Sequence, residues 1–356
     1  MSRPNDTATA DDAEEATQSF AAAMPKVSLH LHLEGAVEAG TVLDLAARHN
    51  VPIPANRSAE QLYDLAAHAD LGEFLRTYDL VGTVIRDAAD FHQVTYENLA
   101  LGAAHNVLHR EMFVSVQAHP GVPYRTLLDG ITAGIVDAEA DFGITCRLIM
   151  AVNREKPPAH ALELVRTVAE HRSDYVIGIG LDYAEVNGPP QRFAQAFQLA
   201  RQVGLHRTAH SESGPPGNIT TLLDILECER IDHGYHVLTD PAVTARCRDE
   251  GIPFTCTPVT SAATGASRDR PGSHQTVGAM VAAGLAVAID SDDPPMFGTD
   301  PTRDLHELAT AHGYRPAELL QFTTTAVEAA WLDDSDRRAL RARVDAVAQA
   351  AARPAV

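Results

Sequence analysis

Short apolar runs alternate with helix-like stretches along most of this chain, and this alternation limits the possible folds more than any other feature. Residues 159–171, 190–203, 241–250 and 276–283 have the length and spacing of helices, and the last three are followed by glycine. Alternating strands and helices are typical of a parallel sheet, and eight such units in 356 residues predict a single (β/α)8 TIM barrel. The eight predicted strands are residues 27–34, 109–119, 145–153, 175–182, 205–212, 230–237, 253–260 and 286–293.

The alternation is broken once, between the first two predicted strands. Residues 35–108 contain several helix-like stretches instead of one. Within residues 70–86, apolar side chains such as Leu71, Phe74 and Tyr78 recur at helical spacing. We therefore expect extra helices inserted between strands 1 and 2, where they would cover a small-molecule pocket on the catalytic side of the barrel.

Side chains that bind metals or transfer protons stand at the ends of four predicted strands. On the first strand His30 and His32 are two residues apart, so both imidazoles point to one face. Three later strands end in His210 and Glu212, in His233, and in Asp292 and Asp293. Because the active site of a barrel forms at the C-terminal ends of its strands, these side chains predict a metal-dependent site there.

Composition fits one domain with a large core. Hydrophobic residues make up 45% of the chain and the mean hydropathy is −0.13, so we expect a single barrel domain over residues 25–356. Residues 1–24 are rich in Asp, Glu, Ala and Thr, and we expect a disordered acidic tail. No apolar run is long enough to cross a bilayer, and no basic residue followed by an apolar segment marks a signal peptide. These features predict a cytoplasmic protein without a membrane partner.

Charge and cysteine usage narrow the function further. The net charge of −20 argues against nucleic-acid binding, which requires basic surface. No two cysteines have CxxC spacing, so buried free thiols are favoured over disulfides or a cysteine metal site. The four cysteines are Cys146, Cys228, Cys247 and Cys256.

Three motifs along the chain carry a family resemblance. Residues 25–35 read PKVSLHLHLEG, residues 230–234 read RIDHG, and residues 291–294 read SDDP. In this order they resemble motifs of the adenosine and adenine deaminase family, and the resemblance extends over residues 25 to about 335. It implies a metal-dependent hydrolase that acts on a small purine.

The resemblance also implies one zinc ion per chain, with a coordination position left for water. Zinc lowers the pKa of a bound water to about 7, so hydroxide is available at neutral pH. Matched to the family pattern, the zinc ligands would be His30, His32, His210 and Asp292.

Catalytic roles follow from the same resemblance. His233 would orient and deprotonate the water, with assistance from Asp292. Glu212 would protonate ring N1 as hydroxide attacks C6, after which ammonia leaves. Asp293 would accept a hydrogen bond from a protonated purine N7.

One departure from the family pattern concerns the catalytic acid. The family has HAGE, with the glutamate three residues after the histidine, whereas residues 210–213 here read HSES. Two alignments compete: Ser213 replaces the glutamate, or one residue is deleted and Glu212 takes its role. The following Gly-Pro-Pro and Ile219 match the adenine deaminase continuation EEGPPxxI only with the deletion, which we therefore favour.

A second departure follows the fourth predicted strand. Residues 180–185 read GLDYAE, similar to GLDSSE of the adenine type, with Tyr183 and Ala184 in place of two serines. The large Tyr183 would reshape the floor of the substrate pocket. Glu185 stands where the nucleoside enzymes carry a glycine, and its carboxylate would receive a ring N–H from a free base or a modified purine.

We therefore predict zinc-dependent hydrolytic deamination of a 6-aminopurine to the 6-oxo purine and ammonia. Adenosine, adenine and a modified relative all stay open as substrates. One alternative is a barrel metallohydrolase that cuts a different bond, such as an amide or an ester. Another is a family member that binds a purine without turnover, for which the altered HSES motif is the support. The sequence leaves the oligomeric state open.

Overall fold

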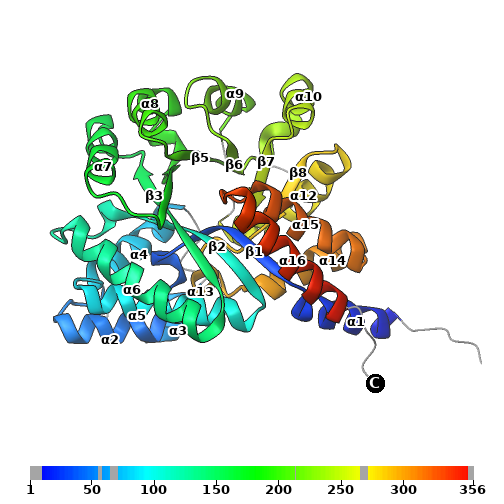
Figure 1. The fold of residues 1–356 in the computed structure, drawn as a ribbon, viewed down its shortest axis with the longest axis horizontal. Helices are drawn as coiled ribbons and strands as arrows, with labels where there is room; N and C mark the ends of the chain where they lie inside the picture. Colours follow the sequence, from blue (N-terminus) through cyan, green and yellow to red (C-terminus); the bar gives the residue numbers. More distant parts are fainter. Residues whose placement is uncertain (1–9, 55–57, 65–70, 213, 265–271, 352–356) are drawn as a thin grey trace, which may run out of the picture.

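Eight parallel strands form one barrel sheet in the order β1 to β8, as the sequence predicts (Figure 1). The computed structural model describes residues 10–54, 58–64, 71–212, 214–264 and 272–351. The strands are β1 (Lys26–His32), β2 (Val107–Val114), β3 (Thr145–Asn153), β4 (Val176–Asp182), β5 (His206–Ser211), β6 (Arg230–His233), β7 (Pro253–Cys256) and β8 (Ala286–Ile289).

Helices surround the barrel on its outside (Figure 1). Those that connect β2 through β8 are α6 (Tyr124–Phe142), α7 (Pro158–Glu170), α8 (Ala194–Gln202), α9 (Pro216–Asp224), α10 (Pro241–Asp249), α11 (Pro258–Ala263) and α12 (Ser273–Ala282). After β8 the chain forms α13 (Pro294–Phe297), α14 (Pro301–His312), α15 (Pro316–Ala329) and α16 (Asp334–Ala351). Helices α15 and α16 both pack against the barrel: α15 contacts β8 and β1, and α16 contacts β2.

Four helices fill the long connection between β1 and β2, which confirms the predicted insertion. They are α2 (Ala39–His49), α3 (Ala59–Leu62), α4 (Leu71–Val84) and α5 (Ala88–Ala104). The apolar stripe predicted for residues 70–86 belongs to α4, where Phe74 and Tyr78 are buried. Asp87 caps the N-terminus of α5 by accepting hydrogen bonds from the N–H groups of Ala89 and Asp90.

Six of the eight strands end earlier than the sequence predicts, and the largest differences, four or five residues, are at β2, β6, β7 and β8. β6 stops at His233 because Gly234 adopts a left-handed conformation, with φ of 74°. β7 stops at Cys256, two residues before Pro258 starts α11. The predicted second strand, residues 109–119, is shifted, since β2 begins at Val107 and ends at Val114. The side chains that follow these short strands consequently lie in loops at the barrel rim.

The expectation of a disordered tail over residues 1–24 is wrong for its second half. Helix α1 (Ala10–Ala23) is formed there, and Phe20, Ala21 and Met24 are buried. It packs against α14, α15 and α16, because these apolar side chains gain by leaving water. Residues 1–9 lie outside the described part of the chain.

The barrel closes between β8 and β1 through two backbone hydrogen bonds and one side chain. The N–H of Asp292 donates to the carbonyl of His30 at 3.1 Å, and the N–H of His32 donates to the carbonyl of Asp292 at 3.1 Å. The Asp290 carboxylate accepts hydrogen bonds from the N–H groups of Leu29 and His30. It also accepts the Ser28 hydroxyl at 2.9 Å. This carboxylate therefore stands in for the backbone ladder that β8 and β1 otherwise lack.

A buried ion pair fills the barrel below the site. The Arg230 guanidinium donates to a Glu111 carboxylate oxygen at 2.8 Å, and both side chains have no solvent exposure. The guanidinium also lies 4.1 Å from the ring centroid of Trp331, a cation–π contact. Neither charge has water as an alternative partner, so each depends on the other.

Two further predictions concern the cysteines and segments that could cross a membrane. All four cysteines are buried and free, as predicted. Within the described residues, no helix has both the length and the apolar character needed to cross a membrane.

We expect Arg230→Met to lower the free energy of unfolding by about 3–5 kcal/mol, because it leaves the Glu111 carboxylate buried without its cationic partner, with the backbone N–H of Trp331 still donating to it. Denaturant unfolding followed by circular dichroism measures this loss. The matched control is Arg246→Met, which removes a 2.7 Å ion pair with Asp224 at the surface and should cost no more than about 1 kcal/mol. A loss below 1 kcal/mol for Arg230→Met would contradict the assignment.

Candidate metal centre and its pocket

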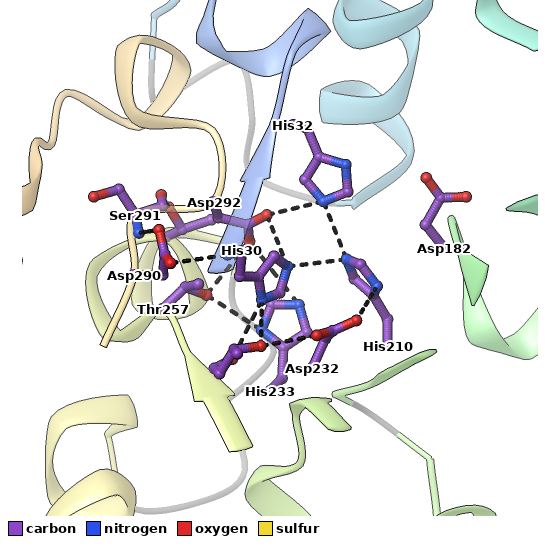
Figure 2. A network of polar contacts seen from close by, with 12 residues as sticks. His30, His32, Asp182, His210, Asp232, His233, Thr257, Asp290, Ser291 and Asp292 are labelled. Carbon is purple, nitrogen blue, oxygen red and sulfur yellow. Dashed lines mark hydrogen bonds and ion pairs between the residues drawn. The ribbon is translucent and has the colours of Figure 1, made fainter. Parts of the chain in front are cut away.

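Four side chains from the ends of β1, β5 and β8 converge on one point (Figure 2). The Nε2 atom of His210 lies 3.1 Å from Nε2 of His30 and 3.1 Å from Nε2 of His32. The Oδ1 atom of Asp292 lies 3.4 Å from Nε2 of His30 and 3.3 Å from Nε2 of His32. The predicted strand geometry is confirmed here, since both histidines of β1 face the barrel axis together.

These spacings fit a metal ion. Ligand atoms at 2.0–2.2 Å from a tetrahedral zinc stand about 3.3–3.5 Å apart, close to the observed separations. A wider grouping, with ligand atoms within 4.8 Å of one another, takes in His233 with His30, His210 and Asp292. Nε2 of His233 is 4.0 Å from the other oxygen, Oδ2, of Asp292. We therefore place His233 beside the ligand set and His32 within it.

The electrostatics of the cluster suit a bound cation. Burial lowers the pKa of His30 to about 4 and that of His210 well below its ordinary value, so both imidazoles are neutral, the form that binds metals. At His32 burial is outweighed by a hydrogen bond to Asp292 and by the charges of Asp293 and Asp292, which raise its pKa to about 10. Positive charge is thus stabilised at this point.

Neighbouring side chains orient the histidines. Nδ1 of His210 faces Oδ2 of Asp232 at 3.5 Å, beyond ordinary hydrogen-bond length. Asp232 is itself fixed, because it accepts the hydroxyls of Thr208 at 2.9 Å and Thr255 at 2.8 Å. Nδ1 of His30 lies 3.2 Å from the Thr255 carbonyl. Such partners hold an imidazole with Nε2 turned toward the metal position.

The backbone bends sharply at two of the site residues. His233 has φ of 64° and Asp292 has φ of 63°, in the left-handed region that few non-glycine residues adopt. The bend leaves Nδ1 of His233 3.2 Å from the Thr257 hydroxyl and its Nε2 toward Asp292. Strain of this kind is maintained where the surrounding structure fixes it, often at functional sites.

A cavity of about 640 Å³, counted up to its open mouth, adjoins the cluster. Its walls come from the barrel rim and from α4 and α11; the lining residues are His32, Leu71, Phe74, Leu75, Tyr78, Asp182, Tyr183, Glu185, His210, Glu212, His233, Thr260, Thr264, Asp292 and Asp293.

Three carboxyl groups in this cavity each have a buried oxygen without a partner among the described residues. They are Oε1 of Glu212, Oδ1 of Asp293 and Oδ1 of Asp182. Burial raises the pKa of all three, to about 7 for Asp182. At Asp293 the adjacent charge of Asp292 raises the pKa further. Buried polar atoms normally have partners, so this pocket is built for a ligand that supplies them.

The position of Asp293 depends on a glycine. A Cβ on Gly35 would lie 1.6 Å from Oδ1 of Asp293, so no other residue fits there without moving the carboxyl group. This explains the glycine that closes the first motif.

Glu185, the predicted partner of a ring N–H, also has partners on the loop after β5. It lines the cavity, but its carboxylate accepts hydrogen bonds from the backbone N–H groups of Glu212 and Gly214, the latter at 3.1 Å. The carboxylate thus holds the loop that carries Glu212. Ser213, the alternative acid position, lies outside the described residues.

Sequence reasoning gave no role to three residues that the structure places at the site. Asp232 belongs to the RIDHG motif, and its position before His233 could have drawn attention to it. Asp182 ends β4, as the metal ligands end their strands, and stands apart beyond His32 and His210 in Figure 2. Thr257 carries no recognisable signal, because a single threonine in a strand is common.

Comparison with known proteins gives consistent matches over nearly the whole chain. Residues 25–347 match the family model described as "Adenosine deaminase". An adenine deaminase of Vibrio parahaemolyticus is 34% identical over 330 residues, which cover 92% of this chain and 97% of that protein. An adenine deaminase of Streptomyces coelicolor is 33% identical over 93% of this chain and 97% of that protein.

Solved structures agree with these matches. The crystal structure of an adenine deaminase from Arthrobacter aurescens superposes with a TM-score of 0.86 at 31% identity, and covers 92% of this chain and 99% of that one. A Burkholderia ambifaria amidohydrolase with bound Zn has a TM-score of 0.86 at 33% identity, and covers 98% of this chain and 97% of that one.

We expect His210→Ala to lose the metal, because it removes the one nitrogen that contacts both β1 histidines. Metal content after gel filtration, measured by mass spectrometry, should fall from about one equivalent to near zero. The control is His206→Ala on the same strand, whose imidazole pairs with Glu229 away from the cluster and whose loss should leave the metal bound. Full retention of metal by His210→Ala would contradict the proposed ligand set.

Proposed function

Since this chain belongs to the adenosine deaminase family, hydrolytic enzymes that remove the amino group of aminopurines, we propose that its substrate is adenine and its metal is zinc. The products are then hypoxanthine and ammonia. One observation carries the proposal: the unpaired oxygens of Glu212 and Asp293 open into the same cavity as the metal-ligand cluster. The adenine deaminases at 33–34% identity and more than 90% coverage of this chain support the choice of base.

Zinc is favoured by the ligand chemistry. Three imidazoles and one carboxylate are borderline and hard ligands of the kind that zinc binds. The related amidohydrolase with bound Zn supports the same choice. His30, His32, His210 and Asp292 would hold the ion, one per chain, and the ion would supply a Lewis acid that activates water near neutral pH.

His233 and Asp292 are placed to manage the proton of the attacking water. Nε2 of His233 lies 4.0 Å from Oδ2 of Asp292, beyond direct hydrogen-bond length, and the Thr257 hydroxyl donates to the same oxygen at 3.4 Å. The Thr257 hydroxyl, 3.2 Å from Nδ1, holds the ring in this orientation. We assign His233 as the base that accepts the proton, with Asp292 assisting.

Glu212 and Asp293 would grip two edges of the purine. Burial raises the pKa of Glu212, which favours the protonated carboxyl that would deliver a proton to ring N1. Burial and the charge of Asp292 keep the pKa of Asp293 high, and this carboxyl faces the position of N7 in the proposed pose. Glu185 contributes indirectly, because it holds the backbone of the Glu212 loop; a contact from its carboxylate to a ring N–H stays part of the proposal.

The two alternative functions would use the same metal site. If the scissile bond were of another kind, such as an amide, the substrate would offer no ring nitrogens to the two unpaired carboxyl oxygens of Glu212 and Asp293. A family member that binds a purine without turnover requires a Glu212 that cannot deliver a proton. The buried, unpaired oxygen of Glu212 in the pocket argues against this alternative. A cytoplasmic location also stays part of the proposal, and the four free thiols support it.

We expect the zinc-loaded protein to release ammonia from adenine with a kcat/KM at least about 100-fold above that for adenosine. The panel should also include 2′-deoxyadenosine and N6-methyladenine, with ammonia measured by a coupled assay. Highest turnover on a nucleoside would reject adenine as substrate. If no compound of the panel releases ammonia while one zinc is bound, the two alternative functions are favoured. Calorimetry with adenine then distinguishes them, because a purine-binding protein binds adenine and a hydrolase of another bond does not.

We expect Glu212→Gln to reduce kcat on adenine by about 10²–10⁴-fold, because the amide has the same shape but cannot deliver a proton. Metal content should not change, since the side chain is outside the ligand set. Ser213→Ala is the matched variant and should retain activity. If Ser213→Ala loses activity and Glu212→Gln keeps it, the one-residue deletion is the wrong alignment.

A further inference from the structure

The residue that follows strand β4, Tyr183, has an unusual backbone conformation, and its side chain contacts helix α4. Tyr183 has φ of 66°, a conformation that is unfavourable for an aromatic residue. Its hydroxyl donates to Oδ1 of Asp79 at 2.7 Å, a contact between residues 104 positions apart in the sequence. The ring meets the Tyr78 ring edge-on, with centroids 5.9 Å apart. We call this hydrogen-bonded pair, Tyr183 and Asp79, the clasp.

The phenol is a stable donor in this contact. Burial and the nearby carboxylates of Asp182 and Asp79 raise the pKa of Tyr183 far above its ordinary value, so the hydroxyl keeps its proton. Asp79 is exposed on the outer side of α4, and the pair therefore ties the rim of the barrel to the helix above it. A hydrogen bond to a charged acceptor is among the stronger ones.

The clasp joins the part of the cavity wall that follows β4 to the part that α4 forms. If C6 of the purine is at the metal, with N1 toward Glu212 and N7 toward Asp293, the N3 and N9 edge points outward. The cavity walls not used by these contacts come largely from α4 and from the end of β4, including Leu71, Leu75 and Tyr183. A substituent on N9 would meet this outer wall.

The α4 part of this wall is unsuited to a sugar. Leu71, Phe74 and Leu75 offer no polar atoms to it. The Tyr78 hydroxyl is already engaged with Glu34 at 2.9 Å and with Ser115 at 2.7 Å, and the Tyr183 hydroxyl is engaged with Asp79. Sugar hydroxyls buried against such a wall would lose hydrogen bonds to water without replacement.

We propose that Tyr183, held in place by Asp79, determines specificity by closing the pocket to substituents at N9, so that the free base is accepted and the nucleoside is excluded. This inference rests on the proposed function, since it uses the orientation of the purine given there. It makes Tyr183 a wall of the substrate pocket and Asp79 the residue that positions that wall.

The test compares substrates on the zinc-loaded full chain of Tyr183→Ser, Tyr183→Phe, Asp79→Ala and the double variant Tyr183→Phe/Asp79→Ala. We measure kcat/KM for adenine and adenosine and take their ratio for each protein. Tyr183→Ser should raise the adenosine-to-adenine ratio by about 10–100-fold, because the ring that forms the wall is removed. Tyr183→Phe and Asp79→Ala should each raise it by about 3–10-fold.

The double variant makes the test sharp. If the hydroxyl and Asp79 act through one hydrogen bond, the double variant should change the ratio no more than either single change does. The matched control is Tyr96→Ser, which removes a tyrosine-to-aspartate bond of 2.8 Å to Asp141 between α5 and α6. Its ratio should equal that of the wild type, and circular dichroism should show all the variants folded.

Binding provides a readout that does not need turnover. Calorimetry with hypoxanthine and inosine should show that Tyr183→Ser gains affinity for inosine relative to hypoxanthine by at least about tenfold. Unchanged ratios in both turnover and binding, with wild-type activity on adenine, would overturn the clasp and leave the proposed function standing. Absence of wild-type turnover on adenine would instead overturn the proposed function, and the binding ratios would still decide whether the clasp excludes the sugar.

Discussion

The junction of β8 with β1 is the contact on which the site depends. The segment after β8 joins β1 through two backbone hydrogen bonds, between Asp292 and the β1 residues His30 and His32, and the Asp290 carboxylate accepts the N–H groups of Leu29 and His30. Asp292 adopts a left-handed backbone to make these bonds. The same turn brings its carboxylate to the β1 imidazoles, so the contact that closes the barrel also brings together three of the four proposed metal ligands.

Charge organises the remainder of the pocket. Asp182, Asp292 and Asp293 stand around His32 and stabilise positive charge at this point. A bound cation would meet the same field, which accounts for the concentration of carboxylates in a region that water scarcely reaches. The carboxyls farther from the ligand set, Glu212 and Asp182, have raised pKa values because burial dominates there. One cavity thus contains a carboxylate whose pKa is lowered, Asp292, and carboxyl groups whose pKa is raised.

Periodicity predicted the barrel well because each strand and helix is specified locally. All eight strands were predicted from apolar runs, and helical spacing predicted several inserted helices, of which it located only α4. The errors lie at boundaries: strands 6 and 7 were extended past Gly234 and Pro258, and α1 was expected to be disordered. Helix α1 forms because Phe20 and Met24 pack against helices near the C-terminus, a contact no local pattern encodes. Tertiary burial outweighs local composition in such cases.

By itself the sequence determined the eight-fold alternation, the histidine and aspartate residues proposed as metal ligands, and the motifs that resemble a deaminase. These depend on residue type and short spacing, which a chain displays directly. Only the tertiary structure decided that Glu185 holds the Glu212 loop, that Asp232 faces His210, and that Tyr183 reaches Asp79 across 104 residues. Contacts between distant segments depend on strand register and on backbone turns at the rim. The local pattern specifies neither of them, because a register shift of one residue turns the same side chain to the opposite face of the strand.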